Sequence, residues 1–270
     1  MNNCFKLNNI IRDAGIIFSN LKYLPTGLVA SEVSDIKFRN EYSEIDLVTK
    51  SAVSVLRTVY NIVMGPYIKY YELNLNLKDE DDTHWFFING IVSTRDIVSL
   101  NELALEKIFG VEFSTLYNPT HGLVADLLEC ILERTIDKQT VICTQLYEII
   151  EDLMDNGKKI RLITHSQGGI IASTFLKIMK DSGKTFKDVE IYSFASAADE
   201  DIDVPGVYQE HFFNEKDFVS RIGLMNVKTK GDSYILKNMI GHLLNRDYLE
   251  HFKEGKYCKG KSKLFKYTLK

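Results

Sequence analysis

The sequence predicts an α/β fold with a mainly parallel sheet, helices on both of its faces and an N-terminal helical extension. From about residue 83 to residue 254, short apolar segments typical of buried strands alternate with helical patterns of ten or more residues. Parallel strands need such crossovers, whose right-handedness places helices on both faces. With 45% apolar and 26% charged residues in a chain of 270, the composition is that of a globular protein.

The chain divides into an extension at residues 1–65, an α/β domain at 66–255 and a lysine-rich tail at 256–270. Apolar residues recur at intervals of three and four between Ile45 and Ile62, which predicts a helix, and a Gly-Pro pair then ends the extension. We interpret the extension as extra helices packed on the sheet. A cap over a pocket and a partner-binding unit are the alternatives.

The elements of the α/β domain are predicted from apolar periodicity and from the turn residues that bound each segment. The predicted strands are 67–77, 85–88, 111–117, 160–163, 189–195 and 208–213. The predicted helices are 97–108, 123–134, 138–156, a segment from the end of the fourth strand to about 180, and 241–254. The region 222–240 is ambiguous.

The segment that indicates chemistry is a strand that runs directly into a helix, with Ser166 at the corner and Gly168 two residues later. This pattern is typical of a nucleophile elbow, in which a strained backbone exposes the serine hydroxyl and the helix N-terminus offers N–H groups to an oxyanion. Thr164 occupies the position where the G-x-S-x-G pattern has its first glycine, and its bulk predicts a slightly poorer fit. The alternative is a glycine-containing turn with an incidental serine.

A serine nucleophile needs a base and a carboxylate that orients the base. In the order serine, acid, histidine, the acid follows a later strand. Asp217 follows the predicted strand 208–213 and is the candidate acid, although an Asx turn would also explain it. The competing acids follow the preceding strand and are Asp199, Asp201 and Asp203.

Two histidines, His242 and His251, follow Asp217. His242 comes after a glycine at a predicted helix start and is the candidate base, whereas His251 is expected at the surface of the same helix. His165 and His211 precede the acid, and we expect both to pack in the interior.

The loop after the strand 85–88 is predicted to complete the site. Backbone N–H groups of Ile91 in this loop and of Gln167 after the serine are the candidate oxyanion donors.

These motifs resemble the α/β-hydrolase superfamily, particularly its lipase and esterase branches. The resemblance covers roughly residues 83–252 and includes the elbow, the Asp217-x-Val219 segment and Gly241-His242, which have counterparts in class 3 lipases. It implies Ser166 as nucleophile, Asp217 as acid and His242 as base.

A second set of motifs is similar to an uncharacterised family of chlamydia-like bacteria. It includes Phe87-Ile-Asn89-Gly90 and Asn118-x-Thr120-His121, and it implies that Asn118, Thr120, His121 and Asp126 shape the pocket. Turn formation and helix capping are the alternative for these residues. The candidate substrate-binding residues are Asn89, Gly90 and His121.

Charge and cysteine content exclude several classes. A net charge of −4 disfavours nucleic-acid binding. The four cysteines lack CxxC spacing, so we expect reduced thiols and no metal site. No signal peptide is evident, and the longest uncharged run, Leu162–Leu176, is too short to span a bilayer, so a cytoplasmic location is expected.

The sequence thus predicts a serine hydrolase that cleaves a carboxylic ester, of a small molecule or a lipid, without cofactor or metal. An acyltransferase with the same three residues and a non-catalytic interaction protein are the alternatives. The segment from Lys253 to Lys270 holds seven lysines and one acid, Glu254. Peripheral contact of the tail with an anionic membrane and a solvated or frayed end are the two interpretations. The oligomeric state is not indicated.

Overall fold

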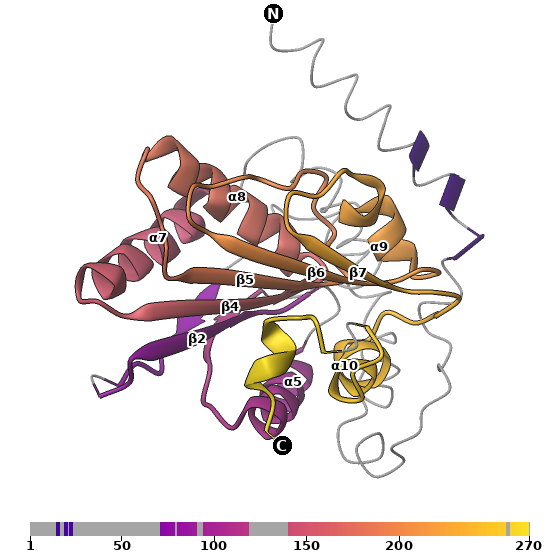
Figure 1. Cartoon of the computed structure of the whole chain (residues 1–270), viewed down its shortest axis with the longest axis horizontal. Helices are drawn as coiled ribbons and strands as arrows, with labels where there is room; N and C mark the ends of the chain where they lie inside the picture. Colours follow the sequence, from indigo (N-terminus) through magenta and orange to yellow (C-terminus); the bar gives the residue numbers. More distant parts are fainter. Residues whose placement is uncertain are drawn as a thin grey trace, which may run out of the picture.

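The computed structural model describes residues 15–16, 19–20, 22–23, 71–78, 80–90, 94–118, 140–257 and 260–269. In this part of the chain, seven strands form one sheet in the order β1-β3-β2-β4-β5-β6-β7, with helices on both faces (Figure 1). The edge strand β1 pairs antiparallel with β3, and all other pairs are parallel. The predicted fold class is therefore confirmed.

The strands are β1 (Glu72–Asn74), β2 (Thr83–Ile88), β3 (Ser114–Tyr117), β4 (Lys159–His165), β5 (Val189–Phe194), β6 (Tyr208–Asn214) and β7 (Asp232–Leu236). The α-helices are α5 (Arg95–Phe109), α7 (Thr140–Asp155), α8 (Gly168–Asp181), α9 (Phe218–Ile222) and α10 (Glu250–Lys253). Short helical segments are η2 (Leu224–Asn226), the π-helical η3 (Leu244–Leu249) and η4 (Leu264–Tyr267).

The central strands and helices agree with the predicted segments, and the differences lie at the sheet edges. The predicted strand 67–77 is reduced, in its described part, to the three residues of β1, and the ambiguous region 222–240 contains the other edge strand, β7. Both edge strands are partly exposed, so they lack the continuous apolar run of a buried strand. The predicted helix 123–134 and most of the extension 1–65 lie outside the described residues.

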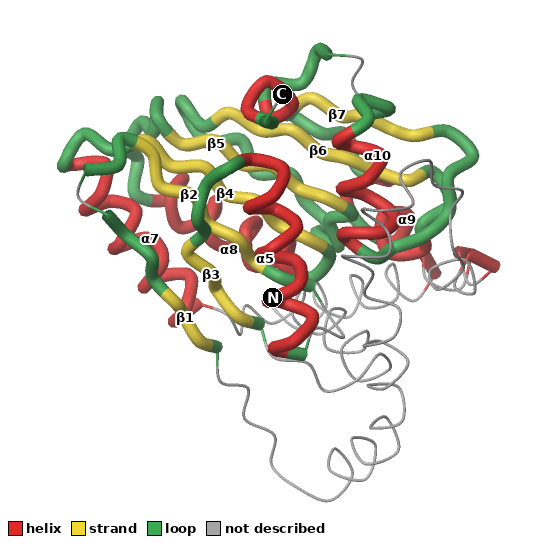
Figure 2. Tube along the Cα trace, turned by 90° about the horizontal axis from the view of Figure 1, so that it is seen from below, coloured by secondary structure: helices red, strands yellow, loops and turns green. Residues whose placement is uncertain are grey.

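Two apolar layers enclose the sheet, because alternate side chains of each central strand point to opposite faces. Phe87 faces the layer formed by α5, η3, α10 and the tail, whereas its neighbour Phe86 faces α7 and α8. Figure 2 shows α5 and α10 in front of the sheet and α7 and α8 behind it. Because helices cover both faces of the sheet, polar groups can meet at the carboxyl ends of its strands.

Described residues of the N-terminal extension pack next to α9. Ile16 and Tyr23 contact the apolar cluster that contains Phe218. Arg221 donates a hydrogen bond of 2.9 Å to the Asn20 side chain, and its guanidinium lies over the Tyr23 ring at 4.2 Å. Ile16, Asn20 and Tyr23 therefore contact the α/β domain, and the role of the extension as a whole stays a prediction.

Residues 260–269 of the tail are anchored to the folded core through Ser262 and Leu264. Leu264 is fully buried, and the buried Glu210 carboxylate accepts hydrogen bonds from the Ser262 hydroxyl at 2.6 Å and from the Leu264 N–H at 3.3 Å. The Lys263 ammonium also lies 2.6 Å from Glu190. The interpretation of a solvated or frayed end is therefore wrong for these residues. Across the described ranges, we find no helix that combines the length and the apolar character needed to cross a membrane.

Candidate active site

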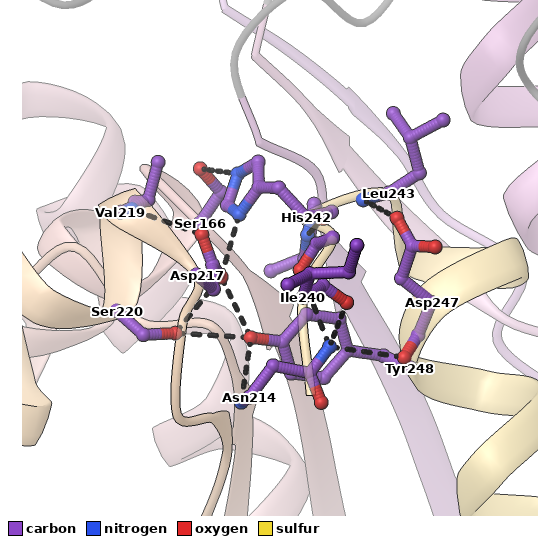
Figure 3. A network of polar contacts seen from close by, with 12 residues as sticks. Ser166, Asn214, Asp217, Val219, Ser220, Ile240, His242, Leu243, Asp247 and Tyr248 are labelled. Carbon is purple, nitrogen blue, oxygen red and sulfur yellow. Dashed lines mark hydrogen bonds and ion pairs between the residues drawn. The ribbon is translucent and has the colours of Figure 1, made fainter. Parts of the chain in front are cut away.

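Three side chains from separate parts of the chain meet at the carboxyl end of the sheet (Figure 3). Ser166 follows β4, Asp217 lies three residues after β6, and His242 lies in the loop between β7 and η3. The Ser166 hydroxyl is 2.9 Å from His242 Nε2, and His242 Nδ1 is 2.9 Å from Asp217 Oδ2. The structure therefore brings together the three residues that the sequence predicts as nucleophile, acid and base.

The backbone around Ser166 has the geometry of a strained corner. Its φ of 57° lies in the left-handed region, which non-glycine residues rarely adopt. The Ser166 N–H donates to the Phe194 carbonyl at 3.0 Å, and the Ser166 carbonyl accepts from Gly169 and Ala197 at 2.9 and 3.0 Å. A Cβ on Gly168 would lie 2.4 Å from the carbonyl oxygen of Ile88, so only glycine fits at the start of α8. Strain of this kind persists only where the surroundings enforce it, and such positions cluster at functional sites.

Thr164, at the first position of the elbow, has a polar partner on the adjacent strand. Its side chain is fully buried, and its hydroxyl donates a hydrogen bond of 3.0 Å to the Ser193 hydroxyl on β5. The two residues are register partners in the parallel ladder. A polar partner on the adjacent strand thus receives the hydroxyl of Thr164. The expected poorer fit stays a prediction.

The loop after β2 runs directly against the serine. A Cβ on Gly90 would lie 2.6 Å from Ser166 Cβ. Asn89 fixes this loop, because its amide accepts from the Asn118 N–H at 2.7 Å and donates to the Asn118 carbonyl at 2.8 Å. The Asn118 side chain in turn donates to Gln167 Oε1 at 2.6 Å. The amide of Asn89 is thus engaged within the protein, and it shapes the loop that faces the serine.

Four predicted site residues, Ile91, Thr120, His121 and Asp126, lie outside the described residues. The roles of Ile91 as oxyanion donor and of the other three at the pocket therefore stay predictions. Gln167, the other predicted donor, is the N-cap of α8 and is fully buried beside Ser166. Its position at the helix N-terminus is suited to an N–H group that binds a developing negative charge.

The Asp217 carboxylate is fully buried and accepts hydrogen bonds from several donors. Besides His242, Oδ2 accepts from the Ser220 hydroxyl at 2.9 Å and from the Tyr248 hydroxyl at 2.6 Å, and Oδ1 accepts from the Val219 N–H at 2.9 Å. Burial alone raises the pKa of this carboxyl, but His242 and the donors together lower the pKa below its ordinary value of 3.8. Asp217 therefore stays ionised next to His242.

Tyr248 was not identified from the sequence. It lies in the π-helical η3, and its hydroxyl is also 3.0 Å from the backbone nitrogen of Asn214 and 3.0 Å from Ser220 Oγ. No local signal marks it, because an aromatic residue in a helical segment is usually a core residue. A π-helical turn so close to the base is itself a feature often found at functional sites.

The other candidate acids and histidines have different partners or positions. Asp201 lies 3.4 Å from His211 and accepts from the Gly231 N–H at 3.1 Å, so it belongs to a separate buried pair. The prediction that His251 is a surface residue is wrong, since its side chain is fully buried. The expectation that His165 only packs is incomplete, because its Nε2 lies 2.9 Å from the carbonyl oxygen of His242.

Within the described ranges, no group of three or more His, Cys, Asp and Glu side chains is arranged to hold a metal ion. The described cysteine, Cys143, is buried, and its thiol donates to the Ile171 carbonyl at 3.5 Å.

A mainly parallel sheet, a strained serine between strand and helix, and an acid and a histidine that follow in this order define an α/β-hydrolase-like fold. Solved structures similar to this chain include esterases. An esterase from Pyrobaculum calidifontis is 10% identical over 82% of this chain and 92% of that chain, with a TM-score of 0.45. A phospholipase/carboxylesterase from Dyadobacter fermentans is 11% identical over 71% of this chain and 97% of that chain, with a TM-score of 0.39.

An arylesterase is 9% identical over 83% of this chain and 96% of that chain, with a TM-score of 0.41. No family model and no curated protein matches the sequence. At about one identical residue in ten, these similarities concern the fold. The resemblances to class 3 lipases and to the chlamydia-like family rest on the sequence motifs alone.

Proposed function

We propose that this protein is a serine hydrolase that cleaves carboxylic esters through an acyl-enzyme. The observation that supports the proposal is the continuous chain of hydrogen bonds from Asp217 through His242 to Ser166, with 2.9 Å at each step. These separations are within the reach that proton transfer requires. The left-handed backbone at Ser166 supports the same interpretation, since it presents the hydroxyl at the carboxyl edge of the sheet.

In the proposed reaction, Ser166 Oγ attacks the ester carbonyl while His242 Nε2 takes the hydroxyl proton. The ionised Asp217 stabilises the resulting imidazolium and holds its ring orientation. The N–H groups of Gln167 and Ile91 bind the oxyanion of the tetrahedral intermediate. His242 then gives the proton to the departing alkoxide oxygen, the alcohol leaves, and the acyl group remains on the serine.

Water completes the cycle by the same steps. His242 removes a proton from water, the hydroxide attacks the acyl-enzyme carbonyl, and the proton returns to Ser166 Oγ as the carboxylic acid leaves. The sequence-based alternative of acyl transfer replaces this water by an alcohol or amine.

The decisive test uses a fluorophosphonate probe and a panel of p-nitrophenyl esters of increasing acyl length. We expect covalent labelling at Ser166 and ester turnover in the wild-type protein, and loss of both in Ser166→Ala. Ser173→Ala is a matched control, because Ser173 is a buried serine on α8 whose hydroxyl donates to the Glu200 carbonyl. A folded wild-type protein that is neither labelled nor active would refute the proposal, as would undiminished turnover in Ser166→Ala.

We also propose that the tail contacts an anionic membrane, where a lipid-like substrate would be found. The apolar Leu264 faces the core, so such contact would use exposed lysines such as Lys261 and Lys266. Truncation would expose the buried Glu210, so charge reversal at Lys261 and Lys266 is the cleaner variant. The fraction of protein that sediments with phosphatidylserine vesicles should be smaller for the double Lys→Glu variant than for the wild type. Equal fractions for the two proteins would refute the proposal.

A further inference from the structure

We infer that His165, the residue before the serine, is a positioning residue that holds the loop of the base His242 in place over Ser166. Its ring lies between the two loops that flank the serine. On one side, Nε2 is 2.9 Å from the carbonyl oxygen of His242. On the other side, Nδ1 faces Gly90, since a Cβ at residue 90 would lie 2.9 Å from it. This inference rests on the proposed function.

The contact with His242 fixes the tautomer of His165. A carbonyl oxygen only accepts, so Nε2 must carry a hydrogen and donate it. Nδ1 of a neutral His165 is then an acceptor, and it has no hydrogen-bond partner among the described residues. The two imidazole rings also lie close together, with centroids 4.9 Å apart and planes inclined by 32°. His165 therefore holds His242 by both its backbone and its ring.

The charge of His165 suits this position. Burial, and then the proximity of His242, lower its pKa to about 3, so it remains neutral at physiological pH. A second cation against His242 would oppose the imidazolium that forms when Ser166 loses its proton. The titratable groups that face His165 are His242 and Asp217, and the Tyr248 ring lies 6.3 Å away.

The arrangement links the nucleophile and the base through one strand. His165 is the last residue of β4, and Ser166 follows it, so the strand that presents the hydroxyl also anchors the loop that receives its proton. His242 is 76 residues away from Ser166 in the chain, and its loop has little regular structure before η3. Displacements of the order of 1 Å can reduce the rate of an enzyme roughly a hundredfold, so such an anchor matters for catalysis.

The test compares His165→Gln, whose side-chain amide can still donate to the His242 carbonyl, with His165→Phe, which keeps a planar ring but has no donor. His84→Phe is the matched control, because His84 is likewise a buried histidine on a central strand, near the opposite end of the sheet. Assays follow p-nitrophenyl ester hydrolysis and the rate of fluorophosphonate labelling.

We expect His165→Phe to lower kcat and the labelling rate roughly ten- to a hundredfold with KM little changed. His165→Gln should recover most of this loss, and His84→Phe should keep wild-type kcat. The pH profile of kcat/KM should have the same apparent pKa in His165→Gln as in the wild type, because His165 does not titrate in the working range. In the wild type and His165→Gln, we also expect the low-field NMR resonance of the His242 Nδ1 proton, and in His165→Phe we expect it to broaden.

Three outcomes would overturn the inference. The first is a wild-type kcat in His165→Phe, and the second is an equal loss of kcat in His165→Phe and His165→Gln. The third is that the pH profile of kcat/KM for His165→Gln lacks an ionisation that the wild type has. The last result would make His165 itself the base. Absence of labelling and turnover in the wild type would instead refute the proposed hydrolase function, so the two failures are distinguishable.

Discussion

The hydroxyl of Tyr248 lies 2.6 Å from the Asp217 carboxylate oxygen that is also 2.9 Å from His242 Nδ1. This residue comes from η3, whereas Asp217 follows β6, so two separate elements define the environment of the acid. A buried carboxylate keeps its charge only where such donors offset the loss of solvation. Tyr248 therefore contributes to the ionised state of Asp217 that the proposed reaction requires.

Tyr248→Phe removes one donor from Asp217 without altering the shape of the core. We expect kcat to fall roughly tenfold with KM little changed, because the hydroxyl supports the acid and does not face the serine. Tyr248 helps to lower the pKa of Asp217, so its loss raises that pKa, and activity on the acid side should disappear at a higher pH than in the wild type. Steady-state kinetics from about pH 4 to pH 9 would measure both effects.

Tyr192→Phe is the control for this prediction. Tyr192 is also a fully buried tyrosine, and it donates to Glu190 at 2.6 Å, at the other end of the sheet. Loss of the Tyr192 hydroxyl should lower the free energy of unfolding and leave kcat and KM unchanged. Equal kinetics for the two variants would show that Tyr248 does not act on the site.

Thr164→Val keeps the shape of the side chain and removes its hydrogen bond to Ser193. We expect the free energy of unfolding to fall by about 1 kcal/mol, because a buried hydroxyl loses its partner. Thr164→Gly restores the usual elbow residue but should lower stability further, through the lost packing and the greater freedom of the unfolded chain. For the wild type and both variants, urea unfolding would give the free energy of unfolding, and ester hydrolysis would give kcat/KM. A gain in kcat/KM for Thr164→Gly would contradict the view that threonine suits this position.

The buried histidines predict how stability varies with pH. Burial lowers the pKa of His165 to about 3 and that of His251 to about 4, from 6.5 in the unfolded chain. The unfolded state therefore binds more protons as the pH falls below 6.5, and stability is lost in that direction. Each histidine contributes a slope that approaches about 1.4 kcal/mol per pH unit.

Urea unfolding at intervals between about pH 7 and pH 5 tests this prediction. His251→Gln should flatten the dependence without altering kcat, because His251 does not contact Ser166, His242 or Asp217. An unchanged slope would mean that His251 titrates similarly in the folded and unfolded states.

Glu210→Gln tests the packing of the tail. The carboxylate is fully buried and accepts from the Ser262 hydroxyl and two backbone N–H groups, so an amide would place its own N–H groups against donors. We expect a loss of about 2–3 kcal/mol in the free energy of unfolding and faster tryptic cleavage after the tail lysines. Glu112→Gln, at an exposed ion pair with Lys78, should change little. Equal stability of both variants would contradict a structural role for Glu210.

The central strands and helices, and the three residues that meet at the site, could be predicted from the sequence because each has a local signal. The apolar run of β4, the glycine after Ser166 and the position of Asp217 after β6 are visible within a few residues. The contacts of Thr164 with Ser193 and of His165 with His242 depend on register and on loops far apart in the chain. Burial of His251 similarly follows from how α10 packs, which periodicity does not specify.

The position of Glu210 has a consequence for the order of assembly. This residue lies on the strand that leads to Asp217. Its carboxylate accepts from the nearby Tyr208 hydroxyl at 2.7 Å, but the Ser262 hydroxyl and the Leu264 N–H, which also donate to it, lie more than fifty positions later in the chain. A folding intermediate that closed the sheet without those residues would desolvate a carboxylate that had lost most of its donors, at a cost of several kcal/mol. The segment 262–264 must therefore dock as this half of the sheet becomes dry, which couples burial of the strand leading to Asp217 to a contact made far along the chain.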